Sequence, residues 1–365
     1  MKVCFVIPTL TGGGAERVAV TVLSALDGRF DRTLYLFSDA DAVYLDRVAP
    51  GVRVVVARQR GWLARMLELS NFLNATRPDI VMPFLSYFIT AIAASLSGGH
   101  GRVIFNQQTP TSGFLDDPDF AWHGRGLRAA FALATRLFYR RADAVVVTSR
   151  GVADDLAERY GVPRAGMVVL HNPIDLEAIT AAARQPVEDS EAGPLVVAAG
   201  RLAGVKNYPL LLDALARLAG VRAWILGDGP ERDQLQQLVV SKGLQARVRF
   251  LGFQPQPWRF IAHGDAFVLT SHYEGFGNVL IEAMACGTPV VATRSAGTVE
   301  IVQDDHNGLL VDADAASVAA AITRVIEDGA LRTRLAGAAS ISVGHYAAPA
   351  VAARYAQLFQ QLVSE

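Results

Sequence analysis

The feature that most constrains this chain is a regular alternation of short apolar segments with amphipathic ones, from the first residues to the last. The short segments have the length and composition of buried strands, and the others carry apolar residues at helical spacing. Such alternation predicts parallel sheets covered by helices on both faces. Strands are expected at 3–8, 32–37, 52–57, 80–82, 103–106, 144–148, 168–171, 195–199, 223–226, 248–252, 266–270, 290–292 and 309–311.

The alternation divides into two runs, separated by a segment at 173–194 that holds three prolines and an acidic cluster but no long apolar run. We predict an N-terminal domain over 1–172, a linker over 173–194 and a C-terminal domain over 195–348. The final helix, at 349–363, is a candidate for packing back on the first domain. The predicted fold class is α/β, with two Rossmann-like doubly wound domains facing a cleft where ligands bind.

Composition excludes several classes of protein. No apolar run is long enough to span a bilayer, and the apolar N-terminus has the length of a strand rather than of a signal peptide. Cys4 and Cys286 are the only cysteines, so neither a disulfide framework nor a zinc site is indicated, and a cytoplasmic protein is expected. Paired acids in two loops are interpreted as capping groups. No metal, other cofactor or nucleic-acid partner is expected.

A glycine-rich turn between two acids marks the strongest candidate site. After the strand at 266–270, the chain passes from Glu274 through Gly277 into a helix that carries Glu282. Such a turn presents backbone N–H groups and the positive end of a helix dipole, which suit a phosphate. The acids on either side therefore indicate a nucleotide bound by its diphosphate and by the hydroxyls at each end.

Two cations follow the first strand of the second domain. Arg201 and Lys206 come after the strand at 195–199, at the carboxyl end where ligands of α/β proteins bind. Arginine offers a bidentate fork and lysine a point charge, which together would neutralise a leaving diphosphate. Two solvated surface cations are the alternative interpretation. The spacing is not that of a Walker loop.

Three further turns at strand ends give weaker indications. Gly12–Gly14 follows the first strand, but Arg17 stands where a dinucleotide fingerprint needs its last glycine. The turn is therefore interpreted as one that approaches a phosphate, or as a simple tight turn. Asp228 lies in a glycine turn after the strand at 223–226, and Phe253 follows the next strand, where a base can lie. Ordinary turn chemistry explains each of these equally well.

Taken together, these motifs resemble those of the GT-B glycosyltransferases of family 4, the retaining enzymes among the glycosyl transferases of group 1. The resemblance rests on Glu274-x7-Glu282, Gly200-Arg201-Leu202 with Lys206-Asn207, Gly227-Asp228-Gly229-Pro230, His171-Asn172-Pro173-Ile174-Asp175 and Gly12-Gly13-Gly14-Ala15-Glu16-Arg17. It covers nearly the whole chain and is strongest from His171 to Gly308. It implies a hexosyltransferase that uses a nucleotide diphosphate sugar, and we expect a UDP-sugar.

The resemblance also implies roles for individual residues. Arg201 and Lys206 would hold the donor diphosphate and, together with Glu274 near the donor sugar, would be the catalytic residues. Glu282 would bind the ribose hydroxyls, and the glycine turn of the first domain would close on the donor. The implied donor-binding set is Gly13, Gly14, Asp228, Phe253, Phe276, Gly277, Asn278, Val279, Leu280 and Glu282.

The acceptor side departs from the family pattern. Family members often carry a histidine after the strand that corresponds to 103–106, whereas this strand runs into Gln107 and Gln108. A glutamine can hydrogen-bond a sugar hydroxyl but cannot act as a base. His123 is a nearby substitute in the sequence. The acceptor-side candidates are therefore Gln107, Gln108 and His123.

The helix expected at 124–140 indicates where an acceptor is held. It combines Arg125, Arg128, Arg136 and Arg140 with leucine and phenylalanine, which is typical of a helix that lies on an anionic membrane. Trp62, Arg65 and Met66 can extend such a face. An ordinary domain helix with a solvated arginine face is the alternative interpretation.

We therefore expect transfer to a glycan acceptor linked to a lipid such as a polyprenol, in cell-surface polysaccharide or glycolipid biosynthesis. Peripheral contact with the inner face of the plasma membrane would accompany it. The alternatives are a soluble small-molecule acceptor, a nucleotide-sugar epimerase of the same fold, and a non-catalytic nucleotide-sugar binder.

Overall fold

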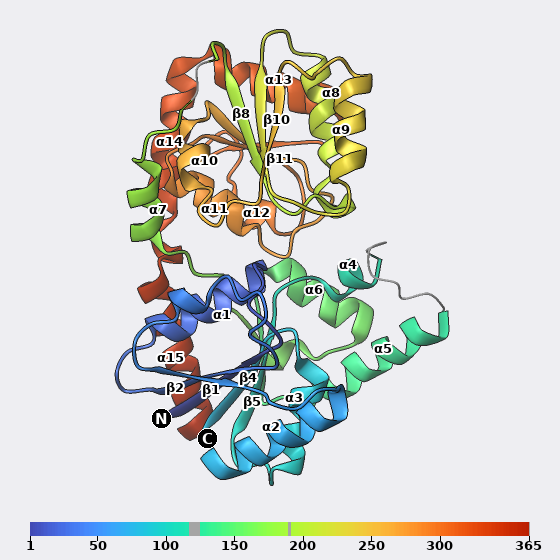
Figure 1. Cartoon of the computed structure of the whole chain (residues 1–365), viewed down its shortest axis with the longest axis vertical. Coiled ribbons are helices and arrows are strands. Elements are labelled where there is room, and N and C mark those ends of the chain that lie inside the picture. The colour runs from blue at the N-terminus through green and yellow to red at the C-terminus, as the bar shows by residue number, and fades with distance from the viewer. Residues whose placement is uncertain (117–124, 189–190, 365) are drawn as a thin grey trace. The chain divides into compact units, whose positions relative to one another are not determined.

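The computed structural model describes residues 1–116, 125–188 and 191–364, which form two compact units (Figure 1). One unit contains nearly all described residues up to Ile174 together with the segment from Tyr346 onward, and the other contains Asp175–His345. Each unit has one parallel sheet with helices on both faces. The structure thus confirms the predicted α/β class, and each expected strand is present to within two residues at either end.

The N-terminal unit has a seven-stranded parallel sheet in the order β3-β2-β1-β4-β5-β6-β7. Its strands are β1 (Lys2–Ile7), β2 (Asp31–Leu36), β3 (Val52–Val56), β4 (Ile80–Pro83), β5 (Arg102–Gln107), β6 (Ala144–Val147) and β7 (Met167–Val169). Its helices include α1 (Gly14–Ala25), α2 (Trp62–Thr76), α3 (Tyr87–Leu96), α4 (Thr111–Asp116), α5 (Arg125–Tyr139) and α6 (Arg150–Tyr160). Because the order reverses between β1 and β4, a topological switch point lies at their carboxyl ends.

Alternate residues of β1 serve two separate cores, as the period of a strand requires. Phe5 and its neighbours two residues away pack with α1 and with the final helix, α15 (Ala348–Ser364). Cys4 and Val6 point to the opposite face, against α2 and α3. The ring of Phe359 on α15 lies edge-on to that of Phe5, with centroids 6.5 Å apart. The final helix is therefore part of the N-terminal core.

The C-terminal unit has a six-stranded parallel sheet in the order β10-β9-β8-β11-β12-β13, with its switch point between β8 and β11. Its strands are β8 (Leu195–Ala199), β9 (Arg222–Leu226), β10 (Val248–Gly252), β11 (Ala266–Leu269), β12 (Val290–Thr293) and β13 (Leu309–Val311). Its helices include α7 (Leu176–Ala183), α8 (Tyr208–Ala216), α9 (Arg232–Ser241), α10 (Trp258–His263), α11 (Asn278–Ala285), α12 (Thr298–Ile301), α13 (Ala315–Glu327) and α14 (Gly329–Ser342).

The segment at 173–194 differs from the linker expected there, because its first half is helix α7 of the C-terminal unit. The carboxylate of Asp175 accepts a hydrogen bond from the amide of Ala178 at 3.0 Å and so caps this helix. Ile179 and Ala182 are buried on its inner face. A helix of two turns is too short to show a clear period in the sequence, which explains the difference.

Candidate active site

Lys206 and Glu274 meet at the switch point of the C-terminal sheet. Lys206 lies in the loop after β8 and Glu274 in the loop after β11, and Lys206 Nζ is 2.6 Å from Glu274 Oε1. The hydroxyl of Ser271 donates to the same carboxylate oxygen at 2.6 Å. The two side chains retain only 19% and 11% of their exposure. The fold thus places the cation and the acid of two separate motifs in one partly desolvated contact, where charges act strongly.

Backbone contacts fix the position of Lys206. The hydroxyl of Thr270, at the end of β11, donates to the carbonyls of Lys206 and Asn207 at 3.2 and 3.0 Å. The amide of His272 donates to the carbonyl of Val205 at 2.9 Å. Asn207 has a φ of +48°, a left-handed conformation that asparagine tolerates better than most residues. The loop after β8 is therefore held directly on the end of β11.

Two glycines of the Gly-Asp-Gly-Pro turn are required by a close backbone approach. A Cβ on Gly227 would lie 1.9 Å from the carbonyl oxygen of Gly200, and one on Gly229 would lie 2.4 Å from that of Leu202. The carboxylate of Asp228 accepts from the amide of Gly229 at 2.8 Å and from Arg232 at 3.0 Å. Asp228 thus stabilises its own turn, and its contact with a donor stays a prediction.

The glycine turn before α11 also has a defined geometry. Gly277 has a φ of +101° and precedes the helix, and the amide of Leu280 donates to its carbonyl at 2.9 Å. The side chain of Phe276 is buried, so only its backbone can face a ligand. A Cβ on Gly297 would lie 2.7 Å from the carbonyl oxygen of Phe276, so the chain after β12 closes over this turn.

Glu282 lies one turn into α11 and is only 2% exposed. The indole N–H of Trp258, the first residue of α10, donates to Glu282 Oε2 at 2.8 Å. Burial raises the pKa of the adjacent Cys286 thiol to about 12, with the charge of Glu282 a smaller cause, so this thiol stays protonated at neutral pH. Trp258 is a residue that our sequence interpretation missed. The sequence indicates only that this tryptophan begins a short helix, which does not by itself predict a functional role.

The remaining predicted donor-side residues lie at the same carboxyl edge of the sheet. Arg201 follows β8 by two residues, and its side chain is exposed. Phe253 comes directly after β10 and is an exposed aromatic side chain. An exposed ring at this edge suits stacking against a base, and an exposed guanidinium suits a diphosphate.

In the N-terminal unit, the glycine turn after β1 is filled by the carboxylate of Glu16. The amides of Gly12 and Gly13 donate to its Oε2 at 2.8 and 3.0 Å. The hydroxyls of Thr9 and Thr11 donate to its Oε1 at 2.8 and 3.4 Å. The amide of Gly13 is therefore engaged within its own turn. Our sequence interpretation did not single out Glu16 as a functional residue.

The acceptor-side glutamines are buried in hydrogen-bond networks. Gln107 Nε2 donates to the carbonyl of Thr109 at 2.7 Å, and the hydroxyl of Tyr139 donates to Gln107 Oε1. Gln108 Nε2 donates to Asn106 Oδ1, and Asn106 Nδ2 donates to the hydroxyl of Tyr355 on α15 at 2.8 Å. Contact of either glutamine with an acceptor stays a prediction. His123 lies outside the described residues.

Leu85 is a second residue that our sequence interpretation missed. It follows β4 at the switch point of the N-terminal sheet, with a φ of +60° and half of its surface exposed. A left-handed leucine is strained by roughly 1–2 kcal/mol, and such strain concentrates at functional sites. The next residue fixes the turn, because the hydroxyl of Ser86 donates to the carbonyl of Val6 at 3.2 Å.

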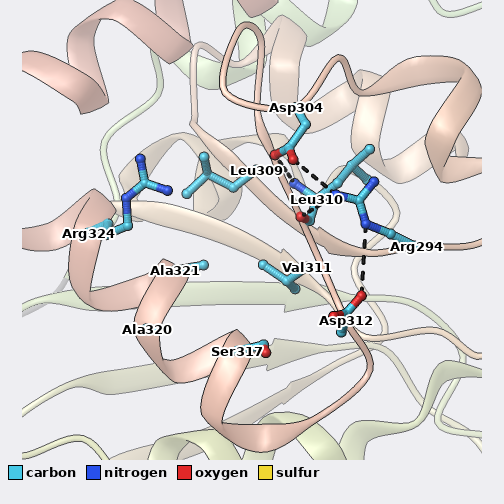
Figure 2. Close-up of a pocket in the computed structure, with 10 residues that line it drawn as sticks. All are labelled: Arg294, Asp304, Leu309, Leu310, Val311, Asp312, Ser317, Ala320, Ala321 and Arg324. Carbon is cyan, nitrogen blue, oxygen red and sulfur yellow. Dashed lines mark hydrogen bonds and ion pairs between the residues drawn. The ribbon is translucent and has the colours of Figure 1, made fainter.

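A cavity of about 320 Å³ lies elsewhere in the C-terminal unit, between β13 and α13 (Figure 2). Its charged residues form ion pairs, with Arg294 3.0 Å from Asp304. This pair covers the outer edge of β13, since Asp304 accepts from the amide of Leu310 at 2.9 Å and Arg294 donates to its carbonyl at 3.3 Å. Such groups protect a sheet edge. We interpret this cavity as structural.

Two family models match the chain, one over each unit. Glycosyltransferase Family 4 matches residues 12–178, and Glycosyl transferases group 1 matches residues 180–340. The N-acetylgalactosamine-N,N'-diacetylbacillosaminyl-diphospho-undecaprenol 4-alpha-N-acetylgalactosaminyltransferase of Campylobacter jejuni is 30% identical over 351 residues, covering 91% of this chain and 92% of that protein. The chain belongs to the group 1 glycosyltransferases of family 4 and is a glycosyltransferase.

A further relative agrees with this assignment, and a solved structure gives the fold. The lipopolysaccharide core biosynthesis glycosyltransferase LpsE of Rhizobium meliloti is 39% identical over 227 residues, which are 61% of this chain and 66% of LpsE, just under two thirds. The crystal structure of Anabaena HepE in complex with UDP-glucose superposes with a TM-score of 0.83 at 24% identity, covering 99% of this chain and all of HepE. The fold is therefore GT-B.

Proposed function

We propose that this enzyme transfers a sugar from a UDP-sugar to a lipid-linked glycan, with retention of the anomeric configuration and without a metal ion. The contact between Lys206 and Glu274 at the switch point of the C-terminal sheet carries this proposal. The names of the relatives support it, since one acts on a diphospho-undecaprenol glycan and another belongs to lipopolysaccharide core biosynthesis. The bound UDP-glucose of HepE supports the donor class.

In the proposed reaction, the bond between the anomeric carbon and the diphosphate oxygen breaks, and the acceptor hydroxyl attacks from the same face. The departing diphosphate oxygen takes the proton of that hydroxyl, so no separate protein base is needed. Lys206 and Arg201 stabilise the charge that develops on the leaving group. These two cations supply the charge for which many transferases use a metal ion.

Glu274 is suited to hold a donor-sugar hydroxyl rather than to attack the sugar. Lys206 and Ser271 both bind its Oε1, which lowers the electron density available for nucleophilic attack. The same two bonds fix the orientation of the carboxylate, so that its second oxygen can accept a hydrogen bond in a defined direction. Positioning of this kind contributes to catalysis by aligning the anomeric carbon.

The exposed surface of α5 supports contact with an anionic membrane. Its inner face packs on α3, with the ring of Phe88 5.4 Å from that of Phe131. Leu133, Leu137 and Arg136 share the outer face, since they are three and four residues apart, and Leu133 is 57% exposed. The described helix carries no acidic residue. Leucines and arginines on one exposed face fit a negatively charged lipid surface.

Helix α2 adds a second exposed apolar group to the same unit. Trp62 is 70% exposed, and Leu63 and Leu67 are also exposed on this helix. Met66 does not contribute, because it is buried in the core between α2 and the sheet. Tryptophan favours the interface between water and lipid. Among the described residues no helix is both long and apolar enough to cross a bilayer.

Cosedimentation with vesicles tests the membrane contact. Wild type should sediment with phosphatidylglycerol vesicles at low salt but not with phosphatidylcholine vesicles, because the attraction is largely electrostatic. Replacing Leu133 and Leu137 by serine should weaken the binding, because it removes apolar contact from the face that they share with Arg136. Ile341→Ser is the matched control, since Ile341 is 84% exposed in the other unit. Equal sedimentation of all three proteins would contradict the proposal.

A two-step experiment tests the function itself. A panel of nucleotide sugars is first screened by thermal unfolding, since a ligand at a hundred times its Kd adds roughly 2.7 kcal/mol of stability. The best donor is then incubated with undecaprenyl-diphosphate-linked and soluble glycans, and the anomeric coupling of the product is measured by NMR. An inverted product would refute retention, and transfer to soluble glycans alone would refute the lipid-linked acceptor. Conversion of the donor without acceptor would instead identify an epimerase.

A further inference from the structure

The carboxylate of Glu16 occupies a complete anion-binding cradle at the carboxyl end of β1. Two amides and two hydroxyls, from Thr9, Thr11, Gly12 and Gly13, converge on its two oxygens. Glu16 is only 5% exposed, and it lies in the first turn of α1, where the helix dipole favours a negative charge. A cradle of amides and hydroxyls at a helix start normally suits a ligand phosphate. Here the chain supplies the anion itself.

Three consecutive glycines would otherwise leave this turn without a fixed conformation. Glycine loses more conformational freedom on folding than any other residue, and Gly12 has a φ of +124° that other residues rarely adopt. The bonds to Glu16 hold the turn from the inside. The hydroxyl of Tyr44 holds it from the outside, donating to the carbonyl of Gly12 at 3.1 Å. The glycines permit a tight turn, and Glu16 selects one conformation of it.

We propose that Glu16 is a positioning residue for the transfer reaction, which holds the glycine turn of the N-terminal unit in the conformation that catalysis requires. This inference rests on the proposed function. Glu16 already uses the amides of Gly12 and Gly13, so these two groups support the turn in this conformation. Glu16 acts through the turn and does not itself touch the reacting atoms.

Chemical rescue tests this role. Glu16→Ala leaves an empty cradle, and we expect kcat to fall by about tenfold or more, since hydrogen bonds to a charged group are strong. Formate or acetate should restore kcat in a saturable manner, whereas chloride at equal ionic strength should not. Glu16→Gln should lie between wild type and Glu16→Ala, because its single carbonyl oxygen can accept only part of the four bonds. Glu158→Ala is the control, since this glutamate is exposed in the same unit.

Two kinetic results would overturn the proposal. One is a folded Glu16→Ala variant whose kcat lies within twofold of wild type. The other is a loss of activity that carboxylates do not restore and that Glu16→Gln shares in full. If Glu16→Ala does not fold, hydrogen exchange of the Gly12 and Gly13 amides in Glu16→Gln decides, because unchanged protection would refute the holding role. If wild type transfers no sugar, formate should still raise the melting temperature of Glu16→Ala alone, which separates this inference from the proposed function.

Discussion

Both units place a glycine turn and a largely buried acid at the carboxyl end of a central strand, but different groups bind the two acids. In the N-terminal unit, neutral amides and hydroxyls surround Glu16. In the C-terminal unit, the ammonium group of Lys206 and the hydroxyl of Ser271 bind Glu274. The four hydrogen bonds to Glu16 all come from neutral donors of its own turn. The second acid forms part of a charge pair, and the bonds from Lys206 and Ser271 reach only its Oε1.

The difference indicates a division of labour. An acid held by its own backbone fixes the shape of a turn, whereas an acid and a cation at a switch point can act on a substrate. We therefore expect substitutions at the C-terminal pair to change chemistry with little change in fold. Substitutions elsewhere should have smaller effects on kcat, and these effects should shift toward binding or stability.

Lys206→Ala should have the largest effect, a fall in kcat of about a hundredfold or more, as for the loss of one donor to a developing oxyanion. Measured turnover with the preferred donor checks this value. Lys242→Ala is the matched control, because Lys242 pairs with Asp213 in the same unit but lies away from the sheet's carboxyl edge. Turnover of Lys206→Ala within a few-fold of wild type would remove Lys206 from the catalytic residues and with it the contrast between the two acids.

Trp258→Phe should have an intermediate effect. It removes the indole donor at 2.8 Å from Glu282 but keeps an aromatic ring, so the carboxylate loses its orientation with little change in packing. We expect the donor KM to rise by about tenfold, the cost of one hydrogen bond to a charged group. Trp224→Phe is the control, because the buried indole nitrogen of Trp224 has no hydrogen-bond partner among the described residues. Equal kinetics for the two variants would show that Glu282 needs no support from Trp258.

The sequence predicted the strands and the switch-point charges, because both depend on local patterns: the buried strands are short apolar runs, and the charges directly follow them. The close approach of loop backbones at Gly227 and Gly229 is known only from the fold. The role of Glu16 was not predictable in this way. A glutamate at the third position of a helix is ordinary, and only the fold shows that its carboxylate turns back on the preceding loop. Trp258 and Leu85 were also not predicted, because only the fold shows the contact of the one and the backbone conformation of the other.

Leu85→Gly should affect the acceptor more than the fold. Relief of left-handed strain and the greater freedom of glycine in the unfolded chain each amount to roughly 1 kcal/mol and nearly cancel. The melting temperature should therefore change little. If the exposed side chain contacts the acceptor, kcat/KM for the acceptor should fall about fivefold, the value of roughly 1 kcal/mol of apolar contact. Leu96→Ala, at another exposed leucine of the unit, is the control. An unchanged kcat/KM for the acceptor would exclude Leu85 from the acceptor site and leave the glycine turn as the functional feature of the N-terminal unit.

Asp304→Ala should have the smallest effect on activity, because it acts on the sheet edge and not on the switch point. It removes the acceptor of the Leu310 amide and the partner of Arg294, which should lower the free energy of unfolding by about 1 kcal/mol. Denaturant unfolding measures this loss, with Asp312→Ala as the control, since Asp312 is 4.0 Å from Arg294 and almost fully exposed. Donor kcat/KM should stay within about twofold of wild type, because the edge pair lies outside the catalytic contacts. A parallel loss of activity would mean that the β13 edge and the Lys206–Glu274 pair are energetically coupled. The residues that stabilise the C-terminal unit could then not be separated from those that act in catalysis.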